Sequence, residues 1–209
     1  LPRHGHGPSP QVVGGRLFIE GANMFRAVDV YTGRLLWQIS LPGVGTAYDN
    51  TNPDPGGLFV QSNYVSLPDS VYLVYRKKCL RLDPATGRKL SAFTLPRQSG
   101  EKKDPGWGFI SIHKDLLIAG ADPISVSGLF EERNLGRQPL GLYLDGTSSE
   151  RMVVMNRFTG KVLWQRRARY GFVHNTIVAG GDKVVCLGQT RAPRGLLPDT
   201  ERGEERPVP

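Results

Sequence analysis

A short motif that occurs three times constrains the fold of this chain more than any other feature. The copies read "DVYTGRLLWQ" (29–38), "DPATGRKLSA" (83–92) and "NRFTGKVLWQ" (156–165). Each has Asp or Asn, two variable residues, Thr-Gly and a basic residue, and each follows a short apolar run. The Asp or Asn side chain can bond the backbone two residues on, and Gly accepts the positive φ of a turn. The motif therefore predicts a strand, a turn and a second strand. The residues expected to build the three turns are Asp29, Thr32, Gly33, Asp83, Thr86, Gly87, Asn156, Thr159 and Gly160.

A second kind of hairpin alternates with the first. It occurs at residues 10–19, 63–74, 107–119 and 172–186, and its turns carry Gly-Gly, Pro-Asp-Ser, Lys-Asp and Gly-Gly-Asp. These are ordinary hairpin signals. Two hairpins make a four-stranded antiparallel unit, and repetition of such a unit is typical of β-propeller blades. We expect an all-β protein, a β-propeller of four-stranded blades whose ring is partial, with about three and a half blades.

The expected propeller covers residues 12–187 of the 209. Residues 1–11 are expected to form an N-terminal segment, and residues 122–150 a long insertion between the second and third strands of the third blade. Residues 188–209 combine mixed charge with Pro and Gly, a composition typical of a disordered tail. The chain begins at Leu1 without a signal-peptide pattern, which we interpret as the start of a piece of a longer polypeptide.

Composition limits the classes of partner. A net charge of +8 would suit an anionic partner, but the basic residues are scattered through turns and tails instead of gathering with aromatic residues on one face. We therefore expect no nucleic-acid partner, and as partners another protein or the rest of the same polypeptide. No run approaches the ~20 apolar residues of a membrane span. Cys79 and Cys186 lie in apolar strand-like runs, which favours buried thiols over a disulfide.

The repeated motif resembles the pyrroloquinoline quinone (PQQ)-type propeller repeat. This repeat occurs in quinoprotein alcohol dehydrogenases and in the outer-membrane-assembly propeller lipoprotein of Gram-negative bacteria. The resemblance covers most of the chain, and it is weakest where Ser91 takes the place of the repeat Trp. It implies a bacterial protein of the periplasm or cell envelope. It also implies that Trp37 and Trp164 dock against neighbouring blades, and that the second blade docks more weakly.

The first strand of each blade lines the centre of a propeller. The residues expected to face this channel, as candidates for ligand contacts, are Asn63, Tyr64, Trp107, His174 and Asn175. Trp107 could stack against a planar ligand, and His174 and Asn175 could supply polar contacts. The alternative is that these side chains fill the channel wall.

The sequence favours a protein without catalytic activity. By resemblance, a quinoprotein dehydrogenase would add a calcium or lanthanide ion held by Glu, Asn and Asp, together with a catalytic Asp, and no carboxylate in this sequence stands in a matching context. Motifs for nucleophilic, phosphate-binding or zinc chemistry are also absent from the sequence. We expect a binding or protein-interaction scaffold with no catalytic residue, metal or cofactor. Two alternatives stay open: the propeller part of a PQQ-dependent dehydrogenase, with PQQ and calcium as cofactors, and an outer-membrane protein assembly factor that binds a peptide across the propeller face.

Overall fold

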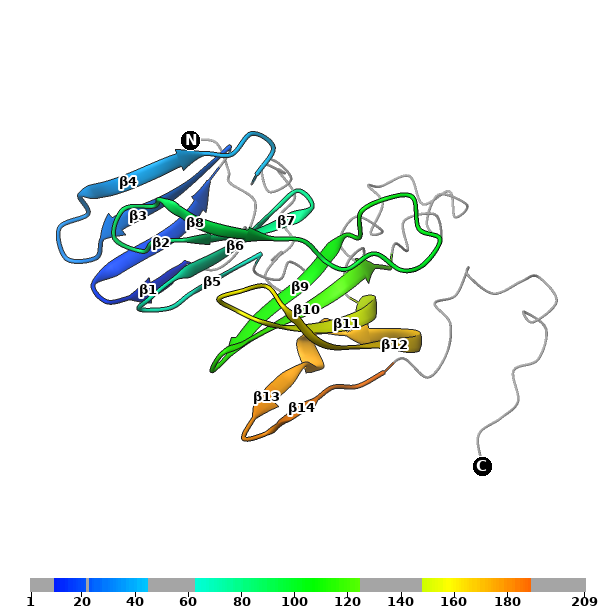
Figure 1. The fold of residues 1–209 in the computed structure, drawn as a ribbon. Helices are drawn as coiled ribbons and strands as arrows, with labels where there is room; N and C mark the ends of the chain where they lie inside the picture. Colours follow the sequence, from blue (N-terminus) through cyan, green and yellow to red (C-terminus); the bar gives the residue numbers. More distant parts are fainter. Residues whose placement is uncertain (1–9, 22, 45–62, 125–147, 189–209) are drawn as a thin grey trace, which may run out of the picture.

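The computed structural model describes residues 10–21, 23–44, 63–124 and 148–188 (Figure 1). The predicted disordered tail lies almost wholly outside the described residues, as do most of the predicted N-terminal segment and most of the predicted insertion. Among the described residues, no helix is long and apolar enough to span a membrane.

The first blade is a four-stranded antiparallel sheet whose strands follow chain order. Its strands are β1 (Gln11–Val13), β2 (Arg16–Gly21), β3 (Met24–Asp29) and β4 (Leu35–Ser40). The β1–β2 turn holds Gly14 and Gly15, both at positive φ, and the β3–β4 turn is the first copy of the repeated motif. Both predicted hairpins of this blade are therefore confirmed.

The second and third blades repeat the same topology. The second blade consists of β5 (Tyr64–Ser66), β6 (Val71–Tyr75), β7 (Lys78–Leu82) and β8 (Lys89–Phe93). The third consists of β9 (Trp107–His113), β10 (Leu116–Pro123), β11 (Ser148–Asn156) and β12 (Val162–Val173). β10 and β11 extend into both ends of the predicted insertion, since Pro123 pairs with Ser149.

A half blade follows the third blade. It is the two-stranded sheet of β13 (Val178–Gly180) and β14 (Lys183–Val185), which lies beside the third blade in Figure 1. The hairpin predicted over residues 172–186 is present, but its regular first strand begins at Val178, and Phe172 bridges to Gly188 outside the named strands. Phe172 and Val173 end β12, where they pair with Ser149 and Ser148 of the long strand β11, and the chain then makes a 3-10 turn, η3 (His174–Thr176).

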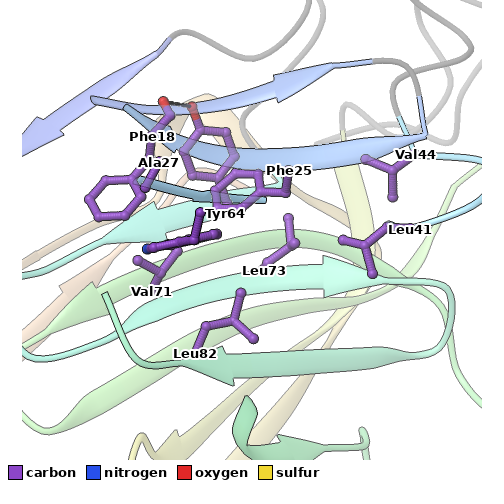
Figure 2. Close-up of a cluster of buried hydrophobic side chains, with 10 residues drawn as sticks. Phe18, Phe25, Ala27, Leu41, Val44, Tyr64, Val71, Leu73 and Leu82 are labelled. Carbon is purple, nitrogen blue, oxygen red and sulfur yellow. Dashed lines mark hydrogen bonds between the residues drawn. The ribbon is translucent and has the colours of Figure 1, made fainter. Parts of the chain in front are cut away.

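The core lies between the sheets, in three clusters that each join consecutive units. The first cluster joins the first and second blades and is the one drawn in Figure 2; it includes Phe18, Phe25, Trp37, Tyr64 and Leu73. The rings of Phe25 and Tyr64 meet edge to face with centroids 4.9 Å apart, a preferred aromatic geometry. A second cluster joins the second and third blades, and a third joins the third blade to the half blade.

The stacking of these units settles the fold class. The first strands β1, β5 and β9 lie next to one another, as the innermost strands of successive propeller blades do. The described chain is an all-β partial β-propeller, with three four-stranded antiparallel blades and half of a fourth.

Candidate functional site

The three repeated turns are built alike. Asp29 accepts hydrogen bonds through Oδ1 from the backbone N–H of Tyr31 (3.1 Å) and Thr32 (2.8 Å) and from the Thr32 hydroxyl (2.9 Å). The N–H of Gly33 closes the turn on the Asp29 carbonyl at 2.9 Å. The same bonds recur at the turns that begin at Asp83 and Asn156. Because the Thr donors favour the charged carboxylate, the pKa values of Asp29 and Asp83 lie below the ordinary Asp range.

Trp37 joins the first blade to the turn of the second. Its indole Nε1 donates to the Pro84 carbonyl at 3.1 Å. Its ring lies against Gly87, where a Cβ would sit 2.6 Å from the nearest ring atom, and only 9 % of Trp37 is exposed. The glycine at this position therefore both turns the chain and leaves room for the ring.

On the second blade, Phe93 and Tyr72 make the contacts with the third blade that correspond to those of Trp37. Phe93, two residues beyond Ser91 on β8, packs against Gly160 so closely that a Cβ there would overlap the phenyl ring. The Tyr72 hydroxyl donates to the Arg157 carbonyl at 3.1 Å, which corresponds to the Trp37–Pro84 bond. Phe93 thus supplies the ring contact with the turn glycine, and Tyr72 supplies the hydrogen bond to the turn carbonyl. Both are present at the blade where Ser91, in place of Trp, predicted weaker docking.

Trp164 occupies the equivalent position on the third blade but has no such contact among the described residues. The side chain is 39 % exposed, whereas Trp37 is 9 % exposed. Its Nε1 has no hydrogen-bond partner in the described part of the chain. The docking role predicted for Trp164 therefore stays a prediction.

The half blade leaves further apolar side chains exposed. Val178 and Val185 face each other across β13 and β14, and both are more than 60 % exposed. The neighbouring pair, Ala179 and Val184, packs on the third blade from the opposite face of the hairpin. We call Trp164, Val178, Val185 and Leu187 the open end of the blade stack.

Three of the predicted channel residues, Asn63, Tyr64 and Trp107, are hydrogen-bonded to groups within the protein. Tyr64 is fully buried, with its hydroxyl donating to the Phe18 carbonyl at 3.1 Å (Figure 2). Burial raises its pKa. The amide of Asn63 donates to Glu20 at 2.6 Å, and burial raises the pKa of that carboxyl although the Asn63 bond opposes the shift. The Trp107 indole donates to the Lys77 carbonyl at 3.2 Å.

His174 and Asn175 lie on η3 instead of a channel strand. Asn175 is exposed, whereas His174 is fully buried and its Nε2 lies 2.7 Å from the Ser149 hydroxyl. The imidazole also stacks on Phe109, with ring centroids 5.6 Å apart. Ser149 is fully buried as well, so this Ser–His pair tethers η3 to the third blade. The binding roles of these residues stay predictions.

Sequence reasoning missed several residues that join the blades. Phe93 could have been found, because it lies on the same strand face as Ser91. The Gln11 side chain links two innermost strands, donating to the Tyr64 carbonyl at 2.9 Å and accepting from the Ser66 N–H at 2.7 Å. One thiol is also less buried than predicted: Cys79 is enclosed, which raises its pKa to about 12, but Cys186 is half-buried.

No group of three His, Cys, Asp or Glu side chains in the described part of the chain lies close enough together to hold a metal ion. The indole N–H of Trp107 and the amide of Asn63 are already engaged within the protein.

No protein-family model matches the chain, and no curated protein is similar to it at a significant level. Solved structures do match. The quinohemoprotein alcohol dehydrogenase from Comamonas testosteroni is 16 % identical with a TM-score of 0.47, over 79 % of this chain and 21 % of its own length. A europium-containing methanol dehydrogenase is also 16 % identical with a TM-score of 0.47, over 79 % of this chain and 25 % of its own.

The computationally designed protein Ika8 is 12 % identical with a TM-score of 0.50, over 85 % of this chain and 41 % of its own. This chain therefore spans less than half the length of each of these proteins. At such identities a structural likeness concerns the fold alone, and the fold of the described residues is a partial β-propeller.

Proposed function

We propose that this chain is a non-catalytic PQQ-like propeller segment that serves as a protein-interaction scaffold, as part of a larger protein in a bacterial periplasm or cell envelope. The observation that carries the proposal is the open end of the blade stack. There, Trp164 and Val185 are exposed, whereas Trp37 and Phe18, which occupy the equivalent positions of the first blade, are buried.

Position-by-position comparison of the blades supports this function. One position on the second strand of each complete blade pairs with the residue that lies two before the Asp or Asn of the turn. It is occupied by Phe18, Tyr72 and Ile118, and all three are fully buried by the unit that follows. Val185 lies at the corresponding place on β14 and is 62 % exposed. Large exposed apolar side chains can mark an interaction site, and Trp is among the residue types most often responsible for interface affinity.

Two assays test this function. In the first, the chain is mixed with PQQ, calcium and a primary alcohol, and dye-linked oxidation is followed. A scaffold shows no turnover and retains no quinone absorbance after desalting, whereas turnover would favour the dehydrogenase alternative.

In the second assay, the immobilised chain is exposed to a bacterial envelope extract, in parallel with a Val185→Asp variant and a Val12→Asp variant. Val12 is 57 % exposed on β1, at the other end of the stack, and serves as the matched control. We expect proteins retained by the wild type and Val12→Asp to be lost with Val185→Asp. Identical retention by all three chains, or none by any, would contradict the scaffold role of the open end.

A further inference from the structure

Two filled docking sites define what an aromatic side chain on one blade requires from the next. At the first site, the Trp37 ring lies against Gly87 in the turn of the second blade. Its indole N–H donates to the carbonyl of Pro84, the residue after Asp83. At the second, Phe93 supplies the ring contact and Tyr72 donates to the equivalent carbonyl. At both sites the accepting residues lie in the turn between the third and fourth strands of the next blade.

At the third docking position, Trp164 is present but its acceptor is not among the described residues. The half blade supplies strands equivalent to the first and second of a blade. The edge of β14 that faces away from β13 pairs with no other strand in the described part of the chain. In the complete blades, this edge of the second strand carries the third strand, which leads directly into the Asp/Asn-x-x-Thr-Gly turn.

These observations define the chemistry of an element that would complete the fourth blade. It needs an extended strand that adds to the β14 edge by backbone hydrogen bonds, as in β-strand addition. It needs a glycine at positive φ where the Trp164 ring will lie, because at Gly87 a Cβ would stand 2.6 Å from the Trp37 ring.

We propose that the open end binds a β-hairpin carrying an Asp/Asn-x-x-Thr-Gly turn, which completes the fourth blade with its third and fourth strands. This inference rests on the proposed scaffold function and names the class of partner that the scaffold takes. The occupant is the outer hairpin of a PQQ-type blade, in which the turn glycine receives Trp164 and the carbonyl after the Asp or Asn accepts the indole N–H.

The test uses the full chain and a synthetic peptide of its own outer hairpin, residues 24–40, with Trp37→Phe so that only the protein contributes indole signals. Peptide binding is measured by fluorescence anisotropy, and the three Trp indoles are followed by ¹⁵N NMR. We expect saturable binding that shifts the Trp164 indole resonance downfield and leaves that of Trp107 in place. Trp164→Ala should weaken binding at least about tenfold, as expected for a central interface Trp.

Matched controls separate docking from general stickiness. Leu163→Ala removes an exposed apolar side chain adjacent to Trp164, and successive strand residues point to opposite faces, so binding should be unchanged. A peptide with Gly33→Val should not bind, because its side chain would collide with the indole.

Three results would overturn the proposal. These are no binding at millimolar peptide, equal binding of the Gly33→Val peptide, and a dimer by light scattering in which Trp164 is already covered by a second copy. The scaffold function is tested separately from the hairpin proposal. Val185-dependent retention of envelope proteins without peptide binding would leave the scaffold in place with a different class of partner.

Discussion

Alanine at the repeated turn glycine should cost different amounts of stability in the three blades. Gly33, Gly87 and Gly160 have nearly identical backbones, with φ of 72°, 71° and 72°. An L-residue in this left-handed region costs roughly 1–2 kcal/mol, and this cost is common to all three positions. What differs is the space around the new methyl group.

The space around the methyl group depends on whether an aromatic ring of the preceding blade lies against the glycine. A Cβ at Gly33 meets nothing within 4 Å, whereas at Gly87 it would lie 2.6 Å from the Trp37 ring and at Gly160 it would overlap the Phe93 ring. Overpacking of this kind typically costs a further 1–3 kcal/mol, approximately. We therefore expect Gly33→Ala to lower the free energy of unfolding by about 1–2 kcal/mol, and each of the other two variants by about 2–5 kcal/mol.

Urea denaturation followed by far-UV circular dichroism measures these differences. The comparison is valid if the dependence of the unfolding free energy on urea is the same in all four proteins. The ordering Gly33→Ala least, with Gly87→Ala and Gly160→Ala both clearly larger, is the expected result. Equal losses at all three positions would refute the claim that the turn glycines accommodate the aromatic rings of the preceding blade.

Two further outcomes follow from the same contacts. Trp37→Ala should lower the free energy of unfolding by roughly 3–5 kcal/mol, as removal of a buried Trp does, while Trp164→Ala should cost well under half as much; similar urea midpoints for the two variants would contradict this. Because the folded-state pKa values of Asp29 and Asp83 are lowered, their contribution to stability is present above the unfolded pKa of about 4. This contribution is lost as pH falls through the folded-state pKa values. A variant with both residues changed to Asn should therefore lose less stability than the wild type between pH 5 and pH 2 in acid titrations. An equal loss of stability in the two proteins would contradict the stabilising role of these carboxylates.

Much of the fold could be predicted from sequence because it depends on local chemistry. The Asp29 and Asn156 turns are determined by bonds within five consecutive residues, so their pattern is visible in the sequence and identifies the hairpins. The strand alternation then assigns the four-stranded blade. The end of β12 could not be predicted this way, because Phe172 and Val173 are held as strand by pairing with Ser149 and Ser148 across a long stretch of chain.

The candidate site was harder to predict because docking between blades is a contact between distant segments. The motif places a Trp at one position, so Ser91 predicts that the docking contact is weaker there. Packing requires only an aromatic ring on the correct strand face near the glycine of the next turn. Phe93 meets that requirement. Similarly, a position on a first strand does not determine whether a side chain reaches the channel. Tyr64 lies on such a strand, yet its ring is enclosed between the first two blades.

Hydrogen exchange of the three indole N–H groups in the isolated chain is the most direct test that the blade stack is closed at Trp37 and open at Trp164. The Trp37 N–H is bonded to Pro84 inside the first interface, so we predict slow exchange and strong protection. The Trp164 N–H has no partner among the described residues and should exchange orders of magnitude faster. Protection of Trp164 equal to that of Trp37 would show that the third docking position is already occupied, and would contradict the account.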